Sequence, residues 1–231
     1  MISNMPNEGL ILAVDGPSGT GKSTTCRALA KQLDAKYIDT GAMYRVATLA
    51  VLRKGVDPAD TTAVIAATAD LPLEVSNDPD STAVLLGGED VARVIREDEV
   101  TRNVSAVSAI PEVRENLVAL QRKLAREAHR AIVEGRDIGT VVLADAPAKA
   151  FMTASAEVRA RRRQAQNERA GIASDYETVL ADVQRRDAAD SSRKTSPLRP
   201  ADDATLVDTS DMSPEDVIQA LINVVKESVN D

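Results

Sequence analysis

Residues 10–24 read L-I-L-A-V-D-G-P-S-G-T-G-K-S-T, and this stretch decides the fold. Its first five residues are apolar, as in a strand that is buried on both faces. The rest fits G-x-x-x-x-G-K-S, a P-loop whose glycines let successive backbone N–H groups point at phosphate oxygens. Apolar residues then recur at helical spacing through Cys26, Leu29, Ala30 and Leu33, so the loop opens a helix whose N-terminus favours anions. The sequence therefore predicts a nucleoside triphosphate site.

The loop residues are all predicted to hold this triphosphate. They are Gly16, Pro17, Ser18, Gly19, Thr20, Gly21, Lys22, Ser23 and Thr24. Among them, Lys22 is predicted to be catalytic, because its amine reaches the β- and γ-phosphates of the nucleotide. The Ser23 hydroxyl is predicted to ligate Mg²⁺.

Length and charge bound the class of protein. The 231 residues suffice for one α/β domain with an insertion. With 28 basic and 36 acidic residues the net charge is −8, which argues against a nucleic-acid binder but allows a small anion held by local arginines. No apolar run approaches the ~20 residues of a membrane span, and the only cysteine, Cys26, fits a packed thiol in a reducing compartment. We expect a monomeric, cytoplasmic protein without nucleic-acid or membrane partners.

Strand and helix patterns alternate along the chain, which is typical of a parallel sheet covered by helices. Strands are predicted at 10–14, 36–39, 131–133, 149–152 and 205–207. Besides the helix after the P-loop, helices are predicted to end near Lys54 and to start at Pro111 and Pro214. His129, the only histidine, is placed on the Pro111 helix without a catalytic role. The predicted class is α/β, with a central parallel sheet flanked by helices.

Residues 71–98, here called the insert, interrupt this alternation. Residues 73–76 and 82–86 flank the turn-rich N-D-P-D at 77–80 and predict an antiparallel hairpin, to which Gly87-Gly88 and Val91-Ala92 would add a third short strand. An inserted lobe beside a nucleotide site usually closes over a second substrate, although a decorative insertion is the alternative.

Arginines concentrate in two stretches, which is unusual in an acidic chain. They are Arg159, Arg161, Arg162, Arg163 and Arg169 in the first stretch, and Arg185, Arg186 and Arg193 in the second. One interpretation is a solvated helix, especially for Arg159 and Arg161. The other is a lid whose guanidinium groups neutralise phosphates during transfer while water is excluded. The P-loop upstream favours the lid.

The surroundings of the P-loop narrow the function further. The switch tetrapeptide D-x-x-G and the guanine reader N-K-x-D of GTPases are both absent from the sequence. The strand at 131–133 ends in Glu134, and Gly135-Arg136-Asp137 follows at once. An arginine beside the phosphate site suggests an acceptor that already carries a phosphate, and its ionised oxygen needs no general base.

Four separated motifs now resemble the bacterial cytidylate kinase family. They are G-P-S-G-T-G-K-S-T at 16–24, D-T-G-A-M-Y-R at 39–45, E-G-R-D-I-G-T-V-V at 134–142 and R-R-D-A-A-D-S-S-R at 185–193. The likeness runs from about Leu10 to Val225 and includes the insert. It implies a P-loop NTPase core with a monophosphate-binding insert and an arginine-rich lid. The implied reaction transfers the ATP γ-phosphate to CMP or dCMP with Mg²⁺.

The resemblance also implies roles for individual residues. Positions that match CMP contacts are Thr40, Tyr44, Arg45, Ser105, Arg114, Arg136, Asp137, Arg186, Asp190 and Arg193. Arg136 would hold the acceptor phosphate, and Arg162 and Arg163 match the catalytic arginines of the lid. The loop ends in G-K-S-T, where some relatives have G-K-G-T, and the extra hydroxyl favours magnesium ligation.

The implied base pocket has suitable chemistry. Cytosine presents an amine donor, which a carboxylate accepts, and acceptors at O2 and N3, which suit arginine. Competing functions are a P-loop kinase for UMP, AMP or shikimate, and a nucleotide-binding regulator without catalysis. The implied division is a flexible tail at 1–8 and a single kinase domain at 9–231. Within this domain the core comprises 9–70, 99–154 and 171–231, the insert 71–98 and the lid 155–170.

Overall fold

The computed structural model describes residues 9–230, and the tail predicted for residues 1–8 lies outside them. A parallel sheet of five strands has the order β2-β6-β1-β7-β8, which places the P-loop strand β1 in its centre. Its strands are β1 (Leu10–Asp15), β2 (Lys36–Asp39), β6 (Arg130–Glu134), β7 (Ala148–Thr153) and β8 (Thr205–Asp208). All five predicted strands are confirmed.

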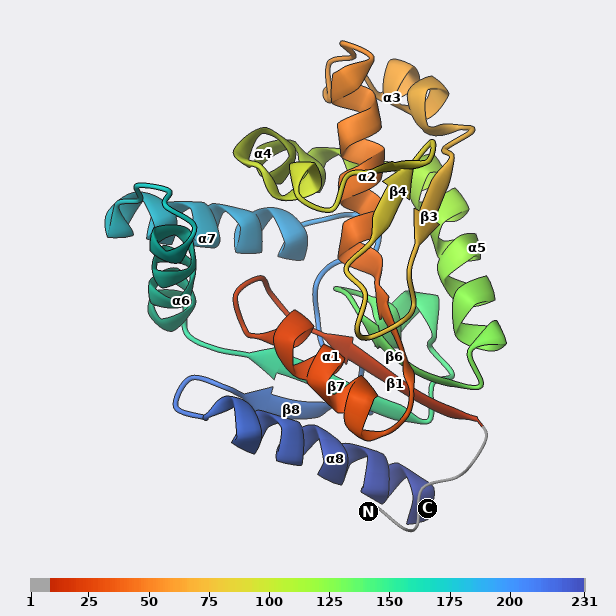
Figure 1. Cartoon of the computed structure of the whole chain (residues 1–231), viewed down its shortest axis with the longest axis vertical. Coiled ribbons are helices and arrows are strands. Elements are labelled where there is room, and N and C mark those ends of the chain that lie inside the picture. The colour runs from red at the N-terminus through yellow and green to blue at the C-terminus, as the bar shows by residue number, and fades with distance from the viewer. Residues whose placement is uncertain (1–8, 231) are drawn as a thin grey trace.

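Helices cover both faces of the sheet (Figure 1). On one face, α1 (Lys22–Gln32) and α8 (Pro214–Asn230) share a core in which Cys26, Leu29 and Leu221 are fully buried. On the other face, α2 (Thr40–Arg53) and α5 (Pro111–Glu127) bury Met43 and Val113. The α/β class with a central parallel sheet is confirmed, and Cys26 is a packed core thiol as predicted.

The sheet brings distant acids to one edge. In the parallel register, Asp39 of β2 pairs with Glu134 of β6, and Glu134 pairs with Val14 next to Asp15. Because parallel strands all end at the same edge, the P-loop, the start of α2 and the E-G-R-D segment converge there. This edge carries the candidate site.

The insert contains the predicted hairpin as a separate antiparallel sheet. Its strands are β3 (Leu73–Val75), β4 (Val84–Leu86) and β5 (Glu89–Asp90). The third strand lies at Glu89–Asp90, between the Gly87-Gly88 and Val91-Ala92 pairs from which it was predicted. Gly87 and Gly88 have φ values of +60° and +83° and make a tight turn, so pairing resumes at once with Glu89 opposite Leu86.

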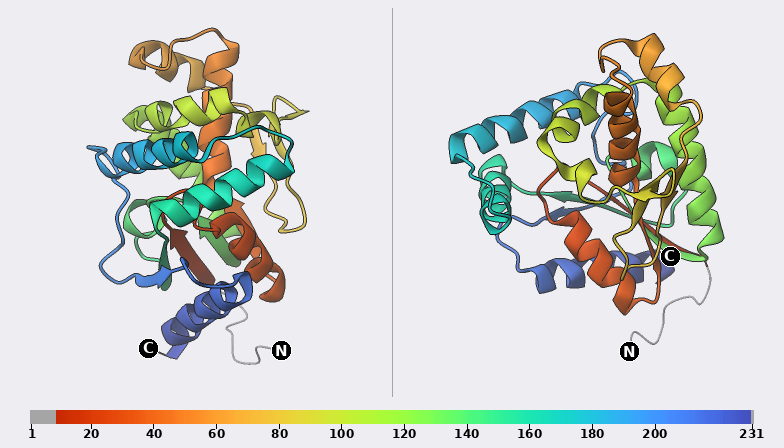
Figure 2. Two further views of the ribbon diagram at one scale, coloured as in Figure 1. Left: turned by 90° about the vertical axis from the view of Figure 1, so that its left-hand side faces the viewer. Right: turned by 45° about the horizontal axis from the view of Figure 1, so that its top comes forward.

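The remaining helical elements surround the sheet and the insert. They are α3 (Thr61–Thr68), α4 (Asp98–Val107), α6 (Ala156–Arg169), α7 (Tyr176–Ser191), the 3₁₀ turn η1 (Val94–Arg96) and the π-type turn η2 (Ile138–Val142). Helices α6 and α7 pack together at one side of the molecule (Figure 2). The placement of His129 on a helix was wrong, because α5 ends at Glu127 and His129 adopts φ +53° in the turn that follows.

Candidate active site

The P-loop crosses the end of the sheet so closely that glycine is required at its start. Gly16 has φ +142°, and a Cβ there would lie 2.0 Å from the carbonyl oxygen of Met152 in β7. Gly21 has φ +94° and directly precedes α1. The loop therefore wraps around the N-terminus of α1, where backbone donors and the helix dipole favour phosphate.

Lys22 lies inside this loop. Its amine donates to the carbonyl oxygens of Gly16 and Pro17, at 2.7 Å each. Burial lowers the pKa of Lys22, because little water remains to solvate the ammonium. A triphosphate in the loop would supply the anionic partner that stabilises the charge.

Ser23, in the first turn of α1, contacts Glu134 at the end of β6. The Ser23 hydroxyl donates to Glu134 Oε1 at 2.7 Å, and the other carboxyl oxygen of Glu134 is buried without a partner. Burial, together with the charge of Asp39, raises the pKa of Glu134. Glu134 is absent from the predicted site residues; its signal in the sequence is an acid that ends an apolar strand.

Asp15 fixes the segment that follows Glu134. Its carboxylate accepts from the backbone N–H groups of Ile138 and Gly139, at 2.8 Å each. Burial raises the pKa of Asp15 to about 6, although both hydrogen bonds oppose this rise. Gly135 is required here, since a Cβ would lie 2.7 Å from the Thr40 hydroxyl. Asp15 thereby holds Arg136 and Asp137 beside the P-loop.

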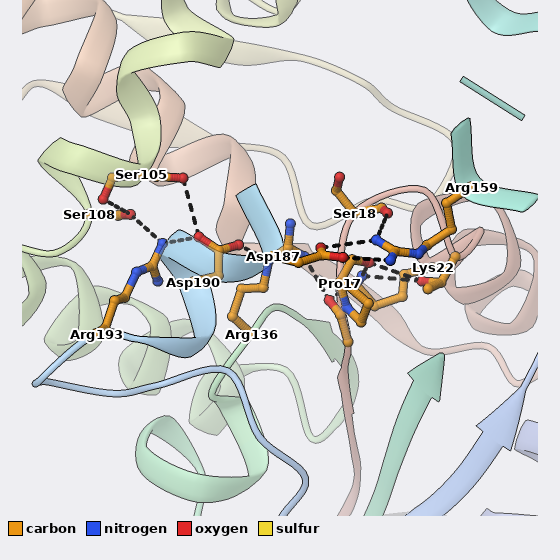
Figure 3. A network of polar contacts seen from close by, with 12 residues as sticks. Pro17, Ser18, Lys22, Ser105, Ser108, Arg136, Arg159, Asp187, Asp190 and Arg193 are labelled. Atoms are coloured by element: carbon orange, nitrogen blue, oxygen red, sulfur yellow. Dashed lines mark hydrogen bonds and ion pairs between the residues drawn. The ribbon is translucent and has the colours of Figure 1, made fainter. Parts of the chain in front are cut away.

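Asp190 on α7 links the predicted acceptor residues into one network (Figure 3). Arg136 donates to Asp190 at 3.0 Å and to the Gly16 carbonyl at 2.8 Å. Arg193 and the Ser105 hydroxyl donate to Asp190 at 2.5 and 3.2 Å. The network runs from α4 to the first glycine of the P-loop, so it joins the predicted CMP residues to the predicted ATP residues.

A second buried pair lies beside this network. Arg114 on α5 forms an ion pair with Asp137, and both are almost fully buried. Arg114 also donates to the Ser108 carbonyl at 3.2 Å, and its guanidinium lies 5.3 Å from the centre of the Tyr44 ring. Arg193 donates to the Ser108 hydroxyl at 3.0 Å, which brings both predicted base-reading arginines to one place.

Several arginines lie close to one another near Arg136 and Asp190. Burial and the charge of Arg186 lower the pKa of Arg45 to about 9, and Arg163 adds to this effect. Burial and Arg136 lower the pKa of Arg186 to about 10, with Asp190 opposing them, and Arg186 Nε is buried without a partner. We call Arg45, Arg136, Arg163 and Arg186 the arginine cluster. Its excess positive charge is typical of an anion site.

The arginine-rich helix α6 touches the P-loop directly. Arg159 donates to the Ser18 carbonyl at 3.2 Å and pairs with Asp187 of α7 at 2.5 Å. Its exposed fraction is 4%, so the solvated interpretation is wrong for Arg159, whereas Arg161 is exposed as that interpretation expects. A Cβ on Gly19 would lie 3.1 Å from Arg159 Cβ, so the glycine at this position lets α6 pack closely against the P-loop. Arg159 and Asp187 were not among the predicted site residues.

The other two predicted lid arginines differ from each other. Arg162 donates to the hydroxyl of Thr209 at 3.1 Å and to its carbonyl at 2.5 Å. Within residues 9–230, Arg163 of the arginine cluster makes one side-chain hydrogen bond, a 3.4 Å contact with Gln166 on its own helix. Arg162 is therefore engaged at the end of β8, and Arg163 is the freer of the pair.

Two predicted acceptor residues make hydrogen bonds outside the Asp190 network in this structure. Thr40 is buried and donates through its hydroxyl to the Glu134 carbonyl at 2.7 Å. Arg45 donates to the Ile95 carbonyl and to the Thr101 hydroxyl, at 2.9 Å each. Arg45 thus connects the site to the insert and to α4.

Comparison with known proteins decides the family. The family model for cytidylate kinase matches residues 12–227. This chain belongs to the cytidylate kinase family. A cytidylate kinase of Corynebacterium glutamicum is 69% identical over 224 residues, which cover 97% of each chain. One of Rhodococcus jostii is 61% identical over 223 residues, covering 96% of this chain and 97% of that one.

Solved structures support the fold of this family member. A gluconokinase from Sinorhizobium meliloti 1021 has a TM-score of 0.52 at 12% identity and covers 97% of this chain and 96% of its own. At such identity the likeness concerns the fold alone. Within residues 9–230, none of the helices is both long and apolar enough to cross a membrane.

Proposed function

We propose that this chain is a nucleoside monophosphate kinase that transfers the γ-phosphate of ATP to CMP or dCMP, giving ADP and CDP or dCDP. The arginine cluster carries the proposal. Burial and the neighbouring guanidinium groups lower the pKa of Arg45 and of Arg186, and Arg136 bonds the Gly16 carbonyl at the same time. Like charges stay together at low cost when an anion neutralises them. An acceptor phosphate in this cluster would lie beside the P-loop, as direct transfer requires.

The donor nucleotide, ATP, would bind at the P-loop, residues 16–24. ATP phosphates there would accept from the N-terminal amides of α1 and from the Lys22 amine. Lys22 now bonds two carbonyl oxygens of the loop itself. We infer that these contacts hold its amine ready for the phosphates.

Magnesium is the cation that this donor site would take. Ser23 is exposed and its hydroxyl lies 2.7 Å from Glu134, whose second carboxyl oxygen is buried without a partner. These are hard oxygen donors, and Mg²⁺ is usually held by one or two such groups plus substrate phosphates. Ser23 would be the protein ligand, and Glu134 would orient its hydroxyl. The bound cation would neutralise charge on the phosphates.

The chain's own residues then have defined tasks. The acceptor phosphate oxygen is ionised near neutral pH, so the site needs no general base. Lys22, Arg136, Arg162 and Arg163 would neutralise charge as the phosphoryl group moves between the two nucleotides. We infer that residues 155–170 close over ATP and the insert closes over the monophosphate, which excludes water.

The base pocket would be formed by Asp137, Arg114, Arg193 and Ser105. The pairing of Asp137 with Arg114 fixes the carboxylate in a buried place next to Tyr44. There it can accept from the cytosine amine, while the arginines donate to O2 and N3. We infer that the enzyme is a cytoplasmic monomer that acts on free nucleotides, in keeping with its net charge of −8.

The experiment that tests this function measures ADP release with a panel of acceptors. Purified protein with MgATP receives CMP, dCMP, UMP, AMP or shikimate in turn. We expect kcat/KM to be highest for CMP or dCMP and lower for UMP by ~10–100-fold, the worth of one mispaired polar contact. A preference for AMP, UMP or shikimate would favour another kinase, and no acceptor-dependent release would favour a regulator.

A further inference from the structure

The tip of the β3–β4 hairpin, residues 77–81, lies on the helix that follows the P-loop (Figure 1). Arg27 of α1 donates to the carbonyl oxygens of Pro79 and Ser81, at 3.1 and 2.5 Å. One turn later on α1, Lys31 forms an ion pair with Asp80. The insert is therefore attached to the core at its far end as well as through α2 and α4.

Arg27 also covers Tyr37, the second residue of β2. The Arg27 guanidinium lies 4.5 Å from the centre of the Tyr37 ring, a cation–π distance. The backbone N–H of Tyr37 donates to the Asn77 carbonyl of the tip at 2.9 Å. Tyr37 itself is 1% exposed. The tip, Arg27 and Tyr37 thus form one packed unit.

The hydroxyl end of the Tyr37 side chain lies near Ser23 and Glu134, the residues proposed to hold magnesium at the donor site. Its hydroxyl faces the Glu134 carboxyl and the Ser23 hydroxyl. Tyr37 Oη and Glu134 Oε2 are both buried without a hydrogen-bond partner of ordinary geometry. Two complementary buried groups, one a donor and one an acceptor, therefore lie beside the Ser23–Glu134 hydrogen bond.

We propose that Tyr37 is a positioning residue for the magnesium-binding edge of the donor site, and that the hairpin tip holds it in place through Arg27. Donation from the Tyr37 hydroxyl would satisfy the free oxygen of Glu134, while Ser23 occupies the other oxygen. Glu134 then has one orientation, and the Ser23 lone pairs face the phosphates. This inference rests on the proposed function, because it assumes that Ser23 binds magnesium.

The arrangement also gives the insert a route to the donor site. A movement of the insert that lifts the tip would free Arg27 from its carbonyl partners and uncover Tyr37. The orientation of Glu134 would then become less defined. The position of the insert would accordingly be coupled to the magnesium affinity of the donor site. A contiguous set of contacts would carry this coupling.

The test compares ADP binding with and without Mg²⁺ by calorimetry, on the full chain. Tyr37→Phe removes only the hydroxyl, and Arg27→Met removes the cover of the ring. We expect each variant to reduce the gain in ADP affinity that Mg²⁺ provides by about fivefold, the worth of one hydrogen bond. Affinity for metal-free ADP should stay the same, since the backbone and Lys22 contacts are untouched.

Lys31→Met is the matched control, because the Lys31–Asp80 ion pair is solvent-exposed and weak, while the Arg27 contacts to the tip and to Tyr37 remain in this variant. It should leave the magnesium gain at the wild-type value. An unchanged gain in Tyr37→Phe, or an equal loss in Lys31→Met and Arg27→Met, would overturn the proposal. If Tyr37→Phe does not fold, the comparison of the two α1 variants decides. A wild type whose ADP affinity ignores Mg²⁺ would instead contradict the magnesium site of the proposed function.

Discussion

At the scale of residues, the charged side chains of this site form buried ion pairs. Asp137 and Arg114 are 3% and 4% exposed, and Asp190 accepts from both Arg136 and Arg193. Removing one member of a buried pair leaves an uncompensated charge, so such pairs restrict which substitutions are tolerated. The side chains that we propose read the base are therefore held in place by protein contacts alone.

Asp137→Asn tests base reading at this scale. The amide offers a donor that can face uracil O4, so we expect the ratio of kcat/KM for CMP over UMP to fall by ~10–100-fold. The ratio, and not the absolute rate, is the measurement, because loss of the pair with Arg114 also lowers stability. Equal slowing with CMP and UMP would contradict contact between Asp137 and the base.

Asp15 gives a pH dependence with a defined sign. Burial raises its pKa from 3.8 to about 6, so between these values the folded protein binds a proton that the unfolded chain has released. This stabilisation is complete below pH 3.8 and is lost as the pH rises through 6. Relative to Asp15→Asn, the wild type should lose at most about 1.4 kcal/mol of unfolding free energy per pH unit in this window. Urea unfolding of both proteins at several pH values checks this. The same pH dependence of the unfolding free energy in wild type and Asp15→Asn would contradict it.

The order of residues alone predicted the side chains whose role is local, and the family resemblance supplied Arg114, Asp137 and Asp190, but Glu134 and Arg159 were missed. The P-loop is a continuous segment, so its glycines, Lys22 and Ser23 are visible in the order of residues. Glu134 and Arg159 acquire their roles from Ser23 and from Ser18 and Asp187, far along the chain. Nothing in the spacing of Arg159 separates it from Arg161, which is exposed. Tertiary packing alone makes the difference.

At the scale of elements, unbroken apolar runs in the sequence predicted the strands of the central sheet. The residues of the turns decided where strands begin and end. β1 and β6 were predictable because both of their faces are buried, which leaves no polar alternation. The third strand of the insert was predicted from Gly87-Gly88 and Val91-Ala92, but β5 comprises only Glu89 and Asp90 between them, because the left-handed Gly87 and Gly88 form the turn. The helix pair α6–α7 joins through Arg159 and Asp187, an ion pair that sequence spacing does not reveal.

This ion pair predicts coupling between α6 and α7. A double-mutant cycle of Arg159→Met and Asp187→Asn should give an interaction energy of about 1–2 kcal/mol in urea unfolding, since Arg159 is buried and bidentate on Asp187. The pair Arg185–Asp182 on α7 is the control, with both side chains more than half exposed. No measurable coupling is expected there. Additive effects at Arg159 and Asp187 would contradict a structural link between the two helices.

At the scale of the whole molecule, two separate segments approach the carboxyl edge of one sheet. The insert approaches from the α2 side, and α6 approaches from the end of β7 (Figure 2). Each enters at its own interruption of the α/β alternation, so each can respond to its own ligand.

Hydrogen exchange tests this division of the chain. CMP should chiefly slow exchange in the strands of the insert, and a non-hydrolysable ATP analogue should chiefly slow residues 155–170. The tip at 77–81 should respond least, because it already lies on α1. Equal protection of both segments by the ATP analogue alone would contradict separate closing.

The central claim is that the arginine cluster presents an acceptor phosphate to the P-loop donor. Phosphorus NMR of the protein with MgATP and either CMP or cytidine tests it most directly. We predict that CMP yields CDP and ADP in equal amounts without free phosphate, and that cytidine, which has no phosphate for the cluster to hold, yields neither product at a comparable rate. Free phosphate in place of CDP, or equal turnover of cytidine and CMP, would contradict the account.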